Sequence, residues 1–349
     1  MTTDEATVAA GSGTDRTQPS PSLGAPPAAR AAPSGAQPRR RTPLLARLRR
    51  DWPMLAMVAP GFLVLLIFSY VPIAGNIIAF QDYNPYLGAN PWQAFVQSEW
   101  IGFGQFQLLF SDPAFWDALR NTLSITAFQL VFYFPLPIFL AIMLHNLLSA
   151  RLRAFVQTVI YLPHFFSWVL VVSFFVAMLG GAGLINDLVR DAGLAPWNIM
   201  INPDTFIILV SSEAVWKDVG WGTIVFLAAL STIDPNLYEA AAADGAGRFR
   251  RLWHITLPGL RPVIVLLLIL RLGDALSVGF EQFLLQRDAV GRQAAEVLDT
   301  FVYYFSIATG NYGYGAAAGL FKAAVGLVLI LAANRFAHML GERGIYSKS

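Results

Sequence analysis

Three segments of the chain, residues 52–81, 121–150 and 154–186, are each at least 30 residues long and contain no Asp, Glu, Lys or Arg. A helix of about 20 apolar residues is enough to cross the hydrocarbon core of a bilayer. The composition agrees, because 56% of the residues are hydrophobic and only 13% are charged, against about 25% charged in soluble domains. The sequence therefore predicts an all-α polytopic membrane protein.

Three further apolar segments, 206–233, 260–285 and 314–340, are long enough to span a membrane but are interrupted by ionisable residues. We predict that they are the fourth, fifth and sixth spans, so that residues 44–349 form one transmembrane domain. Residues 1–43 are rich in Ala, Pro, Ser and Thr and have no apolar run. We expect this segment to be a disordered cytoplasmic tail rather than a secretory signal.

The distribution of basic residues predicts the orientation of the six spans. Fifteen Lys and Arg residues near the membrane fall on the side that holds both termini, and three fall on the other side, namely Arg190, Arg287 and Arg292. Loops rich in Lys and Arg stay in the cytoplasm. Both termini are therefore predicted to be cytoplasmic, in a multi-pass protein of the plasma (inner) membrane.

The predicted cytoplasmic loop between the fourth and fifth spans, residues 234–258, has helix signals at both ends. Asp234 suits an N-cap, Pro235 suits the first helical position, and Gly245 can end the helix in the left-handed conformation. Four alanines favour the helix between them. A second helical stretch is expected at 248–255, and Pro258 is expected to break the path back to the bilayer.

This loop resembles the EAA signature of permease subunits of ATP-binding-cassette (ABC) importers. The signature is Glu-Ala-Ala, three residues, Gly, nine residues, Ile, any residue and Leu-Pro, and its fixed positions are occupied here by Glu239, Ala240, Ala241, Gly245, Ile255, Leu257 and Pro258. The resemblance implies the type I ABC importer (MetI-like) permease fold. It also implies that the short helix couples the permease to a separate ATPase.

The same resemblance implies a set of partners. These are a second homologous permease, two ATP-binding-cassette ATPase subunits that hold the ATP and Mg²⁺, and an extracytoplasmic solute-binding protein. The outer loops 82–119 and 286–312 are the expected docking regions for that protein. The aromatic residues of these loops have an equally plausible role as a packed cap on the helix bundle.

Four shorter runs, 68–85, 121–122, 161–168 and 279–285, resemble permeases of the LplB type, which import polysaccharides and oligosaccharides. The resemblance implies a saccharide substrate. A permease for another solute, such as a glycerol phosphate or a peptide, is the alternative within the same family. Two other classes are a membrane-integral enzyme, motivated by Asp274 and Glu281, and an autonomous secondary transporter, for which no inverted repeat is apparent.

Aromatic and polar residues in the interrupted spans are candidates for a substrate path: Trp216, Trp221, Glu281 and Gln282. Saccharides present hydroxyl groups to amides and carboxylates and apolar faces to aromatic rings, so this mixture is suitable. The alternative for the tryptophans is an interfacial belt. For the charges in the spans, the alternative is structural pairing along one helix face, as Glu213 with Lys217 and Arg271 with Asp274.

Several kinds of chemistry have no sequence signal. The chain has no G-x-x-x-x-G-K-[ST] phosphate loop, no H-E-x-x-H and no G-x-S-x-G. It also has no cysteine, which excludes disulfides and thiolate metal sites. We therefore predict a transport subunit with no catalytic residue, metal site or cofactor of its own, and the scattered basic residues do not indicate a nucleic-acid partner.

Overall fold

The computed structural model describes residues 44–339 and residue 341. The predicted tail, residues 1–43, lies outside the described residues. Contacts within the chain divide it into two units, Met1–Leu63 and Val64–Ser349. The described part of the first unit is helical and belongs to α1 (Leu44–Leu65), which contains Pro53 and Pro60.

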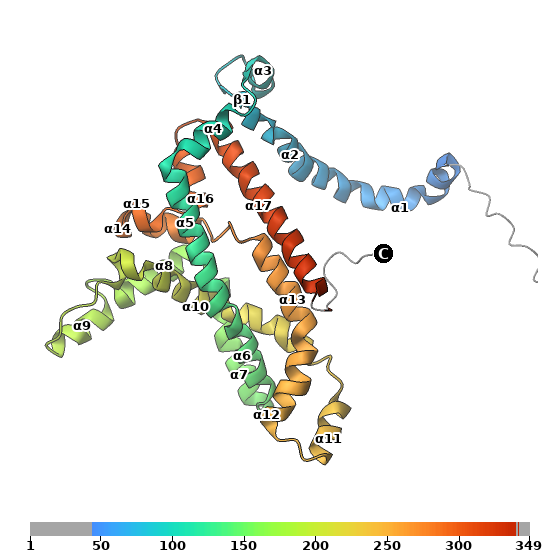
Figure 1. Ribbon diagram of the computed structural model, residues 1–349, viewed down its shortest axis with the longest axis vertical. Helices are drawn as coiled ribbons and strands as arrows, with labels where there is room; N and C mark the ends of the chain where they lie inside the picture. The colour runs from blue at the N-terminus through green and yellow to red at the C-terminus, as the bar shows by residue number, and fades with distance from the viewer. Residues whose placement is uncertain (1–43, 340, 342–349) are drawn as a thin grey trace, which may run out of the picture. The chain divides into compact units, whose positions relative to one another are not determined.

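The second unit consists of helices and one short β-ribbon (Figure 1). Up to residue 145 its elements are η1 (Leu66–Tyr70), α2 (Val71–Gly75), η2 (Asn76–Phe80), β1 (Gln81–Asp82), α3 (Pro91–Gln97), β2 (Glu99–Trp100), α4 (Gly104–Ser111), α5 (Pro113–Phe128), η3 (Gln129–Tyr133) and α6 (Pro135–His145). Strands β1 and β2 pair antiparallel, with Gln81 opposite Trp100 and Asp82 opposite Glu99.

The rest of the second unit contains the predicted loop helix and the last three apolar segments. Its elements are α7 (Ala150–Tyr161), η4 (Leu162–Phe165), α8 (Trp168–Leu179), α9 (Leu184–Asp191), η5 (Ile199–Ile201), η6 (Pro203–Thr205), α10 (Phe206–Leu230), α11 (Pro235–Ala243), α12 (Arg248–Arg251), η7 (Leu252–Thr256), α13 (Leu257–Gly273), α14 (Glu281–Val290), α15 (Arg292–Ala295), α16 (Leu298–Val302), η8 (Tyr303–Ile307) and α17 (Tyr312–Met339).

Five helical stretches in the described part of the chain are long and apolar enough to cross a bilayer: Asp51–Phe80, Pro113–His145, Trp168–Asp191, Arg248–Gly273 and Tyr312–Met339. They confirm the predicted class, a helical protein with several apolar helices. Helix α10 has 25 residues and is not among these five. It carries three charged residues near its middle, Glu213, Lys217 and Asp218, so a sixth span stays a prediction.

The continuous helix predicted for residues 154–186 is wrong, because the structure interrupts it between α7 and α8. Pro163 lies in the 3-10 turn η4, Phe166 and Ser167 are extended, and the Ser167 side chain then caps α8 by accepting a hydrogen bond from the Leu170 N–H. Proline has no N–H to donate and clashes with the preceding turn of an α-helix. The break leaves backbone carbonyls without helical partners, and a side chain from α10 binds two of them.

The predicted fifth span, 260–285, is also shorter in the structure. Helix α13 ends at Gly273, and a non-helical stretch separates it from α14. The local reason is the sequence Gly273-Asp274 at the helix end, followed by Gly279, which has a φ of 116° that favours glycine. The candidates Glu281 and Gln282 are therefore part of a separate helix, α14 (Glu281–Val290), rather than of the span.

Pro258, in contrast, does not break the path between the loop and α13. The chain runs from α12 through the π-helical turn η7 directly into α13, in which Pro258 occupies the first turn. The Leu257 N–H donates to the carbonyl oxygen of Leu252, five residues earlier. The wider π turn gives the proline ring room, so the helix from Arg248 to Gly273 is continuous.

Helix α10 is the central element of the second unit and packs against α6, α7, α8, α5 and α13. Two of its glycines allow the close approach of neighbours. A Cβ atom on Gly220 would overlap the carbonyl oxygen of Ile160 in α7, and one on Gly222 would lie 3.0 Å from the Pro137 ring in α6. Below these contacts Phe226 and Leu230 pack with Ala141 and Leu260 in a buried apolar cluster.

Candidate functional site

Helix α11 forms as its sequence predicts, with both ends closed by local hydrogen bonds. At the start, the Asp234 carboxylate accepts a hydrogen bond from the Asn236 N–H at 2.9 Å, and Pro235 occupies the first turn. At the end, Gly245 has a φ of 74°. The Ala246 N–H donates to the Ala241 carbonyl at 2.8 Å, and the Gly245 N–H donates to the Ala242 carbonyl at 3.0 Å, which is a Schellman motif.

The signature residues on α11 are accessible. Glu239, Ala240 and Gly245 are exposed, and Ala241 is half-buried. No ion pair of the Glu239 carboxylate occurs with any residue that the structure describes. Figure 1 shows α11 beside α12, away from α14 and α15. The helix thus has a small-residue surface and a carboxylate that are both accessible.

The other signature residues join this helix to the membrane segment. Ile255 lies in η7, and Leu257 and Pro258 form the first turn of α13. The hydroxyl groups of Tyr238 on α11 and Thr256 in η7, which is buried, lie 3.1 Å apart in a hydrogen bond. A short, hydrogen-bonded connection therefore joins α11 to the beginning of α13.

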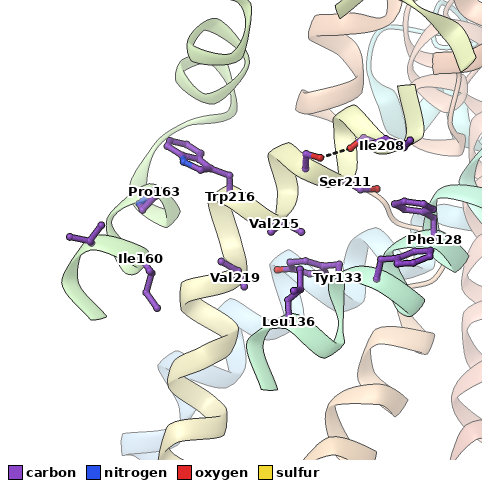
Figure 2. A pocket seen from close by; sticks show the side chains of 13 residues that line it. Phe128, Tyr133, Leu136, Ile160, Pro163, Ile208, Ser211, Val215, Trp216 and Val219 are labelled. Carbon is purple, nitrogen blue, oxygen red and sulfur yellow. Dashed lines mark hydrogen bonds between the residues drawn. The ribbon is translucent and has the colours of Figure 1, made fainter. Parts of the chain in front are cut away.

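Trp216, one of the candidates for the substrate path, lines a cavity of about 590 Å³. Figure 2 shows its ring beside Pro163, with Tyr133 and Phe128 across the cavity. The indole also stacks on the Phe174 ring at 5.2 Å between centroids. Nearly all of the lining is apolar, and it consists of aromatic and aliphatic surfaces of α5, η3, α6, α7, η4 and α10.

Trp221, the second tryptophan candidate, belongs to a polar cluster at the helix break. Its ring is 53% exposed and stacks on the His164 imidazole at 4.7 Å with an interplanar angle of 10°. The His164 Nδ1 lies 2.8 Å from Asp218 Oδ1. An exposed aromatic face beside an imidazole and a carboxylate offers both the stacking surface and the hydrogen-bonding groups that a sugar ring requires.

The expected pairing of Glu213 with Lys217 is wrong, since both side chains have nonlocal partners. The Lys217 Nζ donates to the carbonyl oxygens of His164 and Phe166, each at 2.7 Å. Both carbonyls belong to the break between α7 and α8, so the ammonium group replaces hydrogen bonds that the interrupted helix cannot make. Sequence reasoning missed this role because the break itself was not predicted.

The expected pairing of Arg271 with Asp274 is also absent from the ion pairs of the described residues. The Arg271 guanidinium instead donates to the Gln129 Oε1 at 2.6 Å. Asp274 is the C-cap residue of α13. The arginine thereby joins α13 to the π-helical turn η3.

The side chains of the last two candidates, Glu281 and Gln282, lie in different environments. Glu281 is exposed at the first position of α14. Gln282 is 1% exposed and donates from Nε2 to the Val210 carbonyl at 2.9 Å and to Glu213 Oε2 at 2.7 Å. The structure thus brings Gln282 against α10, while Trp216 and Trp221 lie farther along the same helix.

A set of apolar membrane helices that carries an exposed, doubly capped signature helix next to a membrane segment defines a permease subunit of a transport system. The family model described as binding-protein-dependent transport system inner membrane component matches residues 133–343. The chain belongs to this family. It is therefore a multi-pass inner-membrane protein and a subunit of an ABC transporter.

Curated relatives extend the similarity over most of the chain. The polygalacturonan/rhamnogalacturonan transport system permease protein YteP of Bacillus subtilis is 46% identical over 308 residues, which cover 88% of this chain and 94% of YteP. Protein LplB of the same organism is 45% identical over 303 residues, covering 86% and 93%. The predicted likeness to LplB-type permeases is thus confirmed.

A solved structure shows the same fold. A chain in the crystal structure of a bacterial alginate ABC transporter, in complex with a periplasmic protein that holds an alginate pentasaccharide, superimposes with a TM-score of 0.78. The two sequences are 36% identical, and the alignment covers 86% of this chain and 99% of that chain. This similarity supports the predicted importer-type permease fold.

Proposed function

We propose that this chain is one of two homologous permease subunits of an ATP-driven importer of oligosaccharides, with ATP hydrolysed by two separate ATPase subunits. The observation that carries the proposal is α11, in which the signature residues form a capped, exposed helix hydrogen-bonded to the start of α13. The similarity to permeases named for polygalacturonan, rhamnogalacturonan and alginate transport supports a saccharide substrate.

We further propose that α10 is a membrane span, so that the protein has six spans and both termini in the cytoplasm. Its charged residues are the reason to doubt a span, yet each has a partner inside the protein. Glu213 accepts from two glutamines, Lys217 donates to two carbonyls, and Asp218 contacts His164. Charges in spans are tolerated where they face such partners rather than lipid.

In this proposal the segment 234–258 is the coupling loop of a transmembrane domain that comprises residues 44–349. Glu239 offers a carboxylate to a basic group of the ATPase, and Ala240, Ala241 and Gly245 allow close approach. Ile255, Leu257 and Pro258 pass the displacement to α13, since η7 and α13 form one continuous helix.

For the substrate path we propose Trp221, assisted by His164 and Asp218, and Trp216 at the adjacent cavity. Glu281 is retained as an exposed candidate at the start of α14. Gln282 has a positional rather than a direct role in this proposal, because its side chain is enclosed against Glu213. The solute-binding protein delivers the substrate to the outer loops, residues 82–119 and 286–312.

Uptake by proteoliposomes that contain the complete complex tests the proposed function. We expect ATP-dependent accumulation of an oligosaccharide only when the binding protein is present. Glycerol phosphates and peptides serve as the competing substrates, and screening the binding protein against all three classes identifies the ligand. Uptake of a glycerol phosphate or a peptide in place of an oligosaccharide would refute the saccharide assignment, and uptake by this chain without ATPase subunits would refute the ABC mechanism.

A further inference from the structure

A cluster of three buried polar side chains joins α14 to α10. Glu213 on α10 is fully buried, and Gln282 and Gln286 on α14 are 1% and 2% exposed. The Nε2 atoms of both glutamines donate to the same oxygen, Glu213 Oε2, each at 2.7 Å. The Phe206 and Phe283 rings on the same two helices form an edge-to-face pair at 5.9 Å within a buried apolar cluster. The carboxyl group is thus enclosed between the two helices.

Two oxygen atoms of this cluster accept no hydrogen bond from the described residues: Glu213 Oε1 and Gln286 Oε1. The same carboxyl and amide groups are already joined by one hydrogen bond, from Gln286 Nε2 to Glu213 Oε2. A carboxylic acid and a primary amide pair through two such bonds, in which the amide N–H donates to one acid oxygen and the acid O–H donates to the amide oxygen. One proton on Glu213 Oε1 would therefore satisfy both orphan atoms.

Among the described residues, the Glu213 carboxyl group forms no ion pair with any of these basic groups on the elements around α10: Arg120 on α5, His145 on α6, Arg151 and Arg153 on α7, His164 in η4, Lys217 on α10, Arg271 on α13, Arg287 on α14 and Arg292 on α15. The other acids and the tyrosines on these and the neighbouring elements are Asp117 on α5, Tyr133 in η3, Tyr161 on α7, Asp204 on η6, Asp218 on α10, and Glu281 and Asp288 on α14. Elements α8 and η5 contain no titratable side chain.

The cations next to the cluster in sequence, Lys217 after Glu213 and Arg287 after Gln286, are engaged elsewhere. Lys217 donates to the carbonyls of the helix break. Arg287 forms a buried ion pair with Glu296, with 2.6 Å between Nη2 and Oε2, and lies over the Tyr304 ring. The two amide hydrogen bonds replace only part of the hydration that an anion loses in such an enclosed site, so a buried carboxyl group with no cation favours its protonated form.

We propose that Glu213 is a neutral carboxylic acid that is paired with the Gln286 amide. This acid–amide pair fixes the position of α14 on α10. Helix α10 also carries Trp216, Asp218 and Trp221, so a displacement of α14 moves the candidate substrate path. The role in transport rests on the proposed function, whereas the protonation of Glu213 does not.

Infrared difference spectroscopy of the purified membrane complex tests the protonation directly. The spectrum of wild type minus Glu213→Gln should contain the carbonyl stretching band of a protonated carboxylic acid at neutral pH, and that band should shift in D₂O. The matched control is Asp204→Asn, an exposed carboxylate in the 3-10 turn η6 that precedes α10, whose difference spectrum should contain carboxylate bands only. Carboxylate bands alone in the Glu213→Gln difference would overturn the proposal.

The rank order of three variants tests the positioning role. Glu213→Gln can form an amide–amide pair of the same geometry, whereas Glu213→Asp is too short and Glu213→Met has no polar group. We expect the ratio of binding-protein-stimulated to basal ATPase to be retained in Glu213→Gln and to fall about tenfold in the other two, a factor typical of coupled sites. Retention in Glu213→Asp with loss in Glu213→Gln would instead show that the charge is required and overturn the proposal.

The two failures remain distinguishable. A merely structural defect lowers basal and stimulated ATPase together and leaves their ratio unchanged, which contradicts the positioning role. If the Asp or Met variant does not assemble, the infrared comparison of wild type with Glu213→Gln still tests the protonation of Glu213. Absence of oligosaccharide uptake by the wild-type complex refutes the proposed function and leaves the protonation of Glu213 intact.

Discussion

Charged side chains on the apolar helix α10 form hydrogen bonds with groups that are distant in the sequence. Lys217 is the clearest case, because its ammonium group binds two carbonyls that the break between α7 and α8 leaves free. Asp218, its neighbour, contacts His164 from the same broken segment. Two adjacent residues of α10 thus hold the irregular segment 162–167 in place.

Replacing Lys217 by Met should destabilise the protein by about 1–3 kcal/mol, because two carbonyl oxygens at the helix break lose their charged donor. The measurement is the thermal unfolding temperature of the purified complex. Ser212→Ala is the matched control, since Ser212 is exposed on the same helix and bonds only to the Ile208 carbonyl. An unchanged unfolding temperature in Lys217→Met would show that the ammonium group does not support the break.

A second prediction at this scale concerns close packing. Gly220→Ala should lower stability by about 1–3 kcal/mol, the usual effect of overpacking, because the added methyl group overlaps the Ile160 carbonyl. Gly319→Ala on α17, where nothing lies within 4 Å of the new Cβ, should be tolerated. Equal unfolding temperatures for the two variants would contradict the described contact between α10 and α7.

At the scale of an element, α11 depends on its two caps. Asp234→Ala removes the N-cap and should reduce helix stability by about 1 kcal/mol, and Gly245→Val places a β-branched residue at a φ of 74°, which costs about 1–2 kcal/mol. Both changes should accelerate amide hydrogen exchange over residues 235–243. Asp191→Asn, an exposed residue at the end of α9, is the control, and unaltered exchange in both variants would exclude a cap-dependent helix.

The elements that could be predicted from the sequence are those whose signals are local. The ends of α11 follow from Asp234, Pro235 and Gly245, which act within one turn. The break at Pro163 was not predicted, because the surrounding apolar run satisfies every criterion for a span and the stabilising Lys217 lies more than 50 residues away. The cluster of Glu213 with Gln282 and Gln286 was missed for the same reason, since Gln282 was assigned to the predicted fifth span and Gln286 to the outer loop that follows it, 69 and 73 residues from Glu213.

For the whole molecule, the topology follows from whether α10 crosses the bilayer. The chain contains no cysteine, so single cysteines can be introduced without a background. Six spans place Leu237 on α11 and Asp191 on α9 on opposite sides. We expect a membrane-impermeant maleimide to label Asp191→Cys from outside intact cells and Leu237→Cys only after permeabilisation. Labelling of both from the same side would show that α10 does not span.

The central claim is that α11 couples this permease to an ATPase, and the most direct measurement is ATP hydrolysis and uptake by the reconstituted complex carrying Glu239→Lys. The account predicts that this charge reversal abolishes both binding-protein-stimulated hydrolysis and oligosaccharide uptake, while the complex still binds the loaded binding protein. Asp191→Asn should behave as wild type. Normal uptake and stimulated hydrolysis in Glu239→Lys would contradict the account.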